Sequence, residues 1–162
     1  MLFTARHNVC VSEHLTEYCV DRDLVDHEEA ERACHAVIDA ALPRVETAWM
    51  DAYSDEKDLP SAAREAQESL FQMGRARAEG DPGMGIDLDV RGADHLSLLR
   101  TFASWSIGVE LYDGSMRWVA YMSDTGSSVC FNVTADEATR IQASLGSLPF
   151  TALNDPHARR RR

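Results

Sequence analysis

Apolar residues in the first half of the chain recur at spacings of three and four, which is typical of helices with one buried face. From Asp26 onward this stripe continues as far as Tyr53. Pro43 interrupts the stripe without changing its phase, so we predict a kinked helix pair over 27–42 and 43–54. Pro60 opens a second apolar stripe, which predicts a further helix over 60–78.

The second half of the chain has a different pattern, because apolar and polar residues alternate there. This alternation predicts a strand near 85–91 and three more strands at 106–112, 116–123 and 128–133, with a short helix around 96–103. Asp113-Gly114 is a residue pair that favours a tight two-residue hairpin, so the three later strands should form an antiparallel meander. Thr134 and Glu137 have the spacing of a capping box, which predicts a helix over 134–145.

These elements together predict an α+β fold. We expect an N-terminal helical half to pack on one face of a small antiparallel sheet, with the helix at 134–145 closing the fold. The pattern favours one domain over residues 1–150 and a flexible tail over 151–162 that ends in Arg159–Arg162. Residues 1–22 fit either short strands with a hairpin or a helix that starts at Ser12.

Charge is the strongest compositional feature. The chain has 162 residues and a formal net charge of −11. The last four residues are arginines, so residues 1–158 hold 12 basic and 27 acidic side chains, a net of −15. Such a charge disfavours direct binding to nucleic acid or to an anionic membrane, and it favours a basic partner. Solubility alone explains the charge more simply, because net charge bears on encounter rather than on specificity.

The termini and cysteines bear on location. No apolar run approaches the roughly 18 residues of a membrane span, and residues 1–11 lack the pattern of a signal peptide. We therefore expect a cytoplasmic protein whose four cysteines are reduced thiols.

Metal-type ligands gather in the N-terminal third, where Cys10, His14, Cys19 and Cys34 form the best candidate set. Cys10 and His14 would share a face only if they lay on one helix. Because the paired-cysteine spacing of structural zinc sites is missing, we favour core thiols and surface histidines, and we expect neither a metal nor another cofactor.

Carboxylates offer the best candidate for catalysis. Asp87 and Asp89 alternate with core residues, so they should lie on the exposed side of a strand near His95. A solvated strand face explains them better than an active site does, since no nucleophile–base pair accompanies them.

Aromatic residues of the strand region are the candidate binding anchors: Trp105, Tyr112, Trp118 and Tyr121. We predict a non-catalytic accessory, immunity, anti-defence or regulatory protein that docks on a basic partner protein, for example a nucleic-acid-binding one. The same anchors would suit a homodimer. The alternatives are a metal- or thiol-responsive regulator that uses the N-terminal Cys and His residues, and a small enzyme with an Asp87/Asp89 site.

Overall fold

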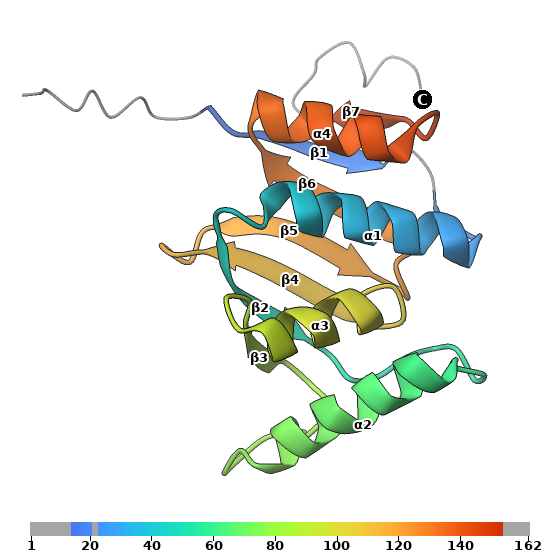
Figure 1. Cartoon of the computed structure of the whole chain (residues 1–162), viewed down its shortest axis with the longest axis vertical. Coiled ribbons are helices and arrows are strands. Elements are labelled where there is room, and N and C mark those ends of the chain that lie inside the picture. The colour runs from blue at the N-terminus through green and yellow to red at the C-terminus, as the bar shows by residue number, and fades with distance from the viewer. Residues whose placement is uncertain (1–13, 21–22, 154–162) are drawn as a thin grey trace, which may run out of the picture.

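A computed structural model describes residues 14–20 and 23–153, and within them the prediction of an α+β fold is confirmed. Within these ranges, seven strands form one antiparallel sheet in the order β3-β2-β4-β5-β6-β1-β7, accompanied by four helices (Figure 1). The strands are β1 (Thr16–Val20), β2 (Val45–Met50), β3 (Ile86–Asp89), β4 (Gly108–Asp113), β5 (Trp118–Ser123), β6 (Ser128–Val133) and β7 (Phe150–Ala152). The helices are α1 (His27–Ala41), α2 (Ser61–Arg75), α3 (Ala93–Phe102) and α4 (Ala135–Leu145).

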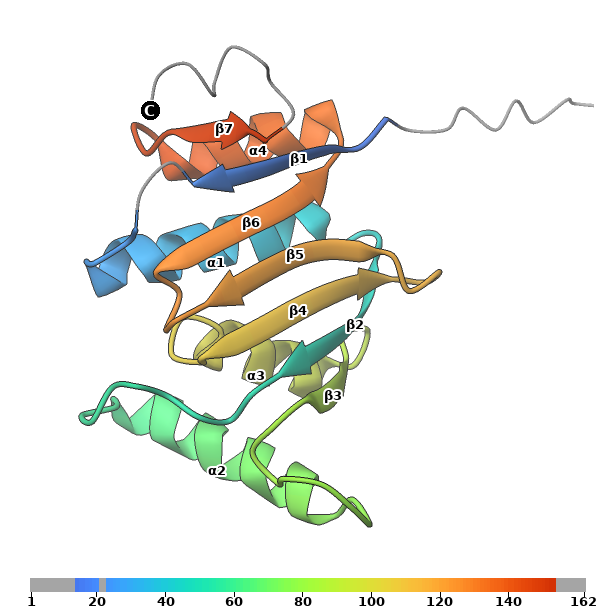
Figure 2. The same cartoon turned by 180° about the vertical axis from the view of Figure 1, so that it is seen from behind.

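The helices lie on one side of the sheet. α1 and α4 pack together over the half that contains β5, β6 and β1, while α3 and α2 pack together beside β3 and β2 (Figure 1). In the view from behind, no helix of the described residues covers the other side of the sheet (Figure 2). The sheet therefore has a covered face and an open face. None of the helices in the described ranges is long and apolar enough to cross a membrane.

The covered face carries the apolar core. Alternate residues of the central strands, such as Leu111, Met122 and Phe131, are almost completely buried beneath the helices. Their helix partners include Ile38 of α1 and Ile141 of α4. The burial of this apolar surface is the main term that stabilises the fold.

The predicted helix over 43–54 is wrong, because this segment forms β2 instead. Val45, Ala48 and Met50 are buried, and a register shift between Val45 and Thr47 interrupts the pairing with β4. This irregularity adds one residue to the strand, so that positions three apart both face the core. The resulting spacing resembles that of a helix, and Pro43 lies in the turn that ends α1 rather than in a kink.

The sheet is also larger than predicted, since β1 and β7 extend it beyond the three later strands. Those strands, β4, β5 and β6, pair as antiparallel neighbours. The predicted two-residue turn at Asp113-Gly114 is wrong, because the Asp113 amide donates to the Arg117 carbonyl and the turn spans residues 114–116, with a positive φ at Met116. Of the two alternatives for residues 1–22, the strand is correct over Thr16–Val20, and residues 1–13 and 21–22 lie outside the described range. β7 occupies the predicted start of the tail, whereas residues 154–162 are not described.

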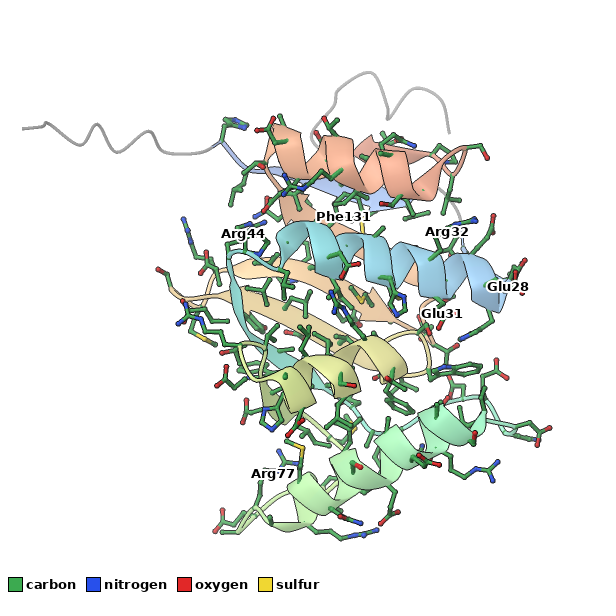
Figure 3. All side chains as sticks on the ribbon, in the orientation of Figure 1. Glu28, Glu31, Arg32, Arg44, Arg77 and Phe131 are labelled. Atoms are coloured by element: carbon green, nitrogen blue, oxygen red, sulfur yellow. A yellow bond between two sulfur atoms is a disulfide. The ribbon has the colours of Figure 1, made fainter. Side chains whose placement is uncertain are left out.

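The predicted capping box of α4 is confirmed. Thr134 Oγ1 accepts the Glu137 amide at 3.2 Å, and the Glu137 carboxylate accepts the Thr134 amide at 2.9 Å. Arg44, labelled in Figure 3, also donates to the Glu137 carboxylate from Nε at 2.8 Å and to the Asn132 carbonyl. The start of α4 is thereby tied both to the end of β6 and to the turn that follows α1.

Candidate binding surface on the open face of the sheet

A single row of residues crosses the open face from one edge of the sheet to the other. Each member pairs directly with the next in the strand register, so the side chains are neighbours on one face. In the order of the strands, the row is Asp87, Trp49, Glu110, Tyr121, Cys130, Cys19 and Thr151. Carboxylates and aromatic rings alternate over its first four positions.

The aromatic rings on this face are only partly covered. Trp49 is 40% exposed and Tyr121 is 37% exposed. Tyr112 lies beside Trp49, with ring centroids 4.9 Å apart, and pairs across the strands with Trp118. The open face therefore presents four aromatic residues from three adjacent strands, on the side of the sheet that Figure 2 shows.

Glu110 is held in place by one of these rings. The Tyr112 hydroxyl donates a hydrogen bond to Glu110 Oε2. Burial, together with this bond, raises the pKa of Tyr112 to about 12, so the hydroxyl keeps its proton at physiological pH and remains a donor. Among the described residues, no hydrogen bond reaches Glu110 Oε1. One carboxylate oxygen is thus anchored and the other is left for a ligand.

Three of the four predicted anchors share this face: Tyr112, Trp118 and Tyr121. Trp105 does not lie on this face. It belongs to the segment that connects α3 to β4, and its ring stacks on His27 with ring centroids 3.5 Å apart. Trp49 takes its place on the surface. The sequence pattern missed Trp49, because its spacing from Val45 and Ala48 predicted a helix with a buried face.

Asp87 and Asp89, the candidate catalytic pair, are both exposed on the edge strand β3. Asp89 accepts the Arg91 amide, and His95 Nδ1 accepts the Asp89 amide rather than contacting a carboxylate. In the described part of the chain, no hydrogen bond or ion pair reaches the Asp87 side chain. The two carboxylates belong to the open face, where Trp49 lies opposite Asp87 and Thr47 lies opposite Asp89.

The cysteines correct one expectation. Cys19 and Cys130 form a disulfide between β1 and β6, with a Cα–Cα distance of 4.1 Å, so these two are not separate thiols. Cys34 is a free thiol buried in α1 under the covered face, where burial raises its pKa to about 12. A neutral thiol is a poor metal ligand.

The alternative metal set is not brought together within the described residues. Cys19 is bonded on the open face, Cys34 lies on the opposite side of the sheet, and His14 is an exposed residue ahead of β1. Cys10 lies outside the described range. Over residues 14–20 and 23–153, no three His, Cys, Asp or Glu side chains are grouped as metal ligands would be.

A shallow groove of about 350 Å³ lies on the helical side, along α1 from Glu28 to Asp39 and beside Ser144 at the end of α4. Its lining includes Glu28, Glu31 and Arg32, which Figure 3 labels on the first turns of α1. Two other lining residues are already engaged with Arg100: His35 with its carbonyl at 2.8 Å, and Asp39 with its guanidinium. The groove therefore resembles a solvated helix surface more than a ligand site.

Comparison with models of protein families, with curated proteins and with solved structures finds no match to this chain.

Proposed function

We propose that this protein is a non-catalytic binding protein that docks on a basic partner protein through the open face of its sheet. One observation carries the proposal: carboxylates and exposed aromatic rings alternate along the row from Asp87 to Tyr121. Aromatic residues often supply most of the binding energy at interfaces, while complementary charge speeds the encounter and selects the partner. The net charge of −15 over residues 1–158 supports a positively charged partner.

This role is that of an accessory, immunity, anti-defence or regulatory factor in the cytoplasm. A nucleic-acid-binding protein is a natural basic partner, since an acidic surface can occupy the site that otherwise binds phosphate.

The test is capture of partners from a host-cell extract. We expect the full-length protein to retain a basic partner that the double variant Trp49→Ala/Tyr121→Ala does not retain. Val25→Ala serves as the control, because Val25 is 90% exposed but lies ahead of α1 and away from the strands. Thermal unfolding of each variant establishes that the fold is intact.

The kinetics of the purified pair then test the role of charge. The association rate should fall between low and physiological ionic strength, because salt screens exposed charges. A rate that does not change would mean that the acids serve solubility alone. Retention of the same partner by the double variant would exclude the open face. Turnover of a small substrate that Asp87→Asn abolishes would overturn the non-catalytic assignment.

A thiol-responsive function is a second proposal, and the Cys19–Cys130 disulfide favours it. Both cysteines lie in the row beside Tyr121, so opening the bond alters the binding surface itself. In a reducing cytoplasm the two thiols would be separate most of the time. We expect partner affinity to differ between oxidised and reduced protein, and equal affinities would remove this proposal.

A further inference from the structure

The acidic half of the open-face row has a regular geometry. Neighbouring strands lie about 4.8 Å apart, so Trp49 and Tyr121 are each one strand away from Glu110, on either side of it. Asp87 follows on the far side of Trp49. Each exposed ring therefore has a carboxylate on an adjacent strand, and Trp49 lies between two of them.

This combination suits a guanidinium group better than an ammonium group. A guanidinium is flat and weakly hydrated, so it can stack on a ring while its N–H groups donate to a carboxylate at the side. An ammonium is compact and strongly hydrated, and at an exposed surface it gains less from the ring. Glu110 is prepared for such a donor, because Tyr112 fixes one carboxylate oxygen and no described residue donates to the other.

The arginines that lie nearby are already paired. The Arg91 guanidinium forms an ion pair with Glu46, and Arg117 donates to Asp113 at 2.8 Å. Within the described part of the chain, neither neutralises Asp87 or Glu110. The negative charge of the row is therefore left to a ligand from outside.

We propose that the open face binds an extended, arginine-bearing segment of the partner protein, with guanidinium groups lying on Trp49 and Tyr121 and donating to Asp87 and Glu110. The inference rests on the proposed function and narrows its partner to one chemistry. The segment runs across the strands, along the row, rather than adding a strand at an edge of the sheet.

The row also sets the spacing of the arginines. Asp87 and Glu110 are two strands apart, which is about 9.6 Å. In a polyproline II segment, residues three apart point in the same direction and are separated by about 9.3 Å. Arginines at every third position therefore match successive carboxylates of the row.

The experiment uses synthetic peptides and the full-length protein. The first peptide carries three arginines, with two prolines between each pair. A second has lysine in place of every arginine, and a third has only one proline between arginines. Affinity is measured by calorimetry and by the change in tryptophan fluorescence. We expect the first peptide to bind at least about fivefold more tightly than the lysine peptide, and more tightly than the peptide with the shorter spacing.

Variants test the residues. Glu110→Gln keeps the shape of the side chain and the acceptor for Tyr112. We nevertheless expect it to weaken the binding of the arginine peptide about five- to tenfold, because the charge-assisted hydrogen bond is lost. Trp49→Ala should reduce the affinity for the same peptide about fivefold. The matched control is Asp55→Asn, which removes the same charge from an exposed position in the loop before α2 and should leave the affinity unchanged.

Several outcomes would overturn the inference. Equal affinity for the arginine and lysine peptides, or equal losses of affinity in Glu110→Gln and Asp55→Asn, would mean that net charge alone explains the binding. The arginine-specific inference would then fail, while the proposed docking on a basic partner would stand. If the peptides bind only after Arg159–Arg162 are replaced by alanine, the open face binds arginines of this chain instead of arginines of a partner. If no peptide binds but the host partner is still lost in Trp49→Ala/Tyr121→Ala, the inference fails and the proposed function stands.

Discussion

The two faces of the sheet are built from the same strands, yet they have opposite characters. On the covered face, Leu111, Met122 and Phe131 are at most 1% exposed. Glu110 is the neighbour of Leu111 on β4, and Tyr121 is the neighbour of Met122 on β5. Both lie on the open face, where the Glu110 carboxylate and the Tyr121 ring face solvent. Because side chains alternate along a strand, a single chain segment supplies core and surface at once. Apolar packing on the covered face should therefore contribute most to stability, and the exposed carboxylates and rings of the open face should be free to serve recognition.

Phe131→Ala should have the largest effect, because it opens a cavity in the covered face. Its ring is buried and packs against Tyr18 and Phe150, with centroids 5.7 Å and 5.1 Å away. Figure 3 labels it beside α1, on the side toward α4. Truncations of this kind reduce the free energy of unfolding by about 3–5 kcal/mol. Urea unfolding monitored by circular dichroism measures the loss.

Tyr121→Ala is the matched control on the next strand, since it removes an aromatic ring from the open face. We expect a change in the free energy of unfolding of about 1 kcal/mol or less, because the ring is 37% exposed and leaves no enclosed cavity. Equal losses in Tyr121→Ala and Phe131→Ala would show that the open face is part of the core, and the comparison between the faces would fail.

Cys19→Ser should have the next largest effect, because it removes the one covalent link on the open face among the described residues. The disulfide joins residues 111 positions apart, and the loss of such a link typically costs about 2–4 kcal/mol of stability. The loss should appear only without reductant. Cys19→Ser/Cys130→Ser should be no less stable than the single variant, whereas titration of both cysteines as free thiols in oxidised protein would contradict the pairing.

Much of the fold was accessible from local patterns. The capping box at Thr134 and the stripe of α1 are decided by residues close in sequence, and the structure has both elements. The hairpin after Asp113 is present as well, but with a longer turn than the predicted two-residue one. β2 was not accessible, because its irregular pairing with β4 depends on a strand about 60 positions later and imitates helical spacing. β7 was missed since three residues at a sheet edge carry too short a pattern.

The candidate surface was only partly predictable for the same reason. Alternation placed Tyr112, Trp118 and Tyr121 in strands, but only the register shows that Trp49 and Asp87 from distant segments complete their face. Trp105 looked equivalent in sequence, yet it follows a helix and stacks on His27. The Cys19–Cys130 pair depends on β1 lying beside β6, which no spacing in the chain indicates.

Asp113→Asn tests an exception to the contrast between an apolar buried face and a charged exposed face, because Asp113 is a buried carboxylate at the end of β4. Burial tends to raise its pKa, but hydrogen bonds from the Arg117 and Ser115 amides and from the Arg117 side chain outweigh this and lower it. Stability from a lowered pKa is present above the ordinary value of about 3.9 and is lost as the pH falls through the folded-state pKa.

We therefore expect the variant to be roughly 1.5 kcal/mol less stable than the parent near neutral pH, from the loss of a charge-assisted hydrogen bond. The difference should shrink as the pH falls through the folded-state pKa, because the parent then binds the proton in both states. Urea unfolding over a series of pH values from neutral to acid measures it. Asp87→Asn on the open face is the control, and a difference for Asp113→Asn that does not depend on pH would contradict the assigned hydrogen bonds.

Thr134→Ala should have the smallest effect on the covered side, because it removes one hydrogen bond at the start of α4. The Glu137 amide loses its acceptor, while the Glu137 carboxylate keeps its bonds to the Thr134 amide and to Arg44. Loss of such a cap costs about 1 kcal/mol, and Thr134→Ser should restore most of it because the hydroxyl returns. Glu137→Gln should cost more than Thr134→Ala, since it leaves Arg44, whose side chain is only 20% exposed, without its charge partner. If thermal unfolding ranks these two variants in the reverse order, the junction between α4 and the covered face is held by the cap rather than by the ion pair.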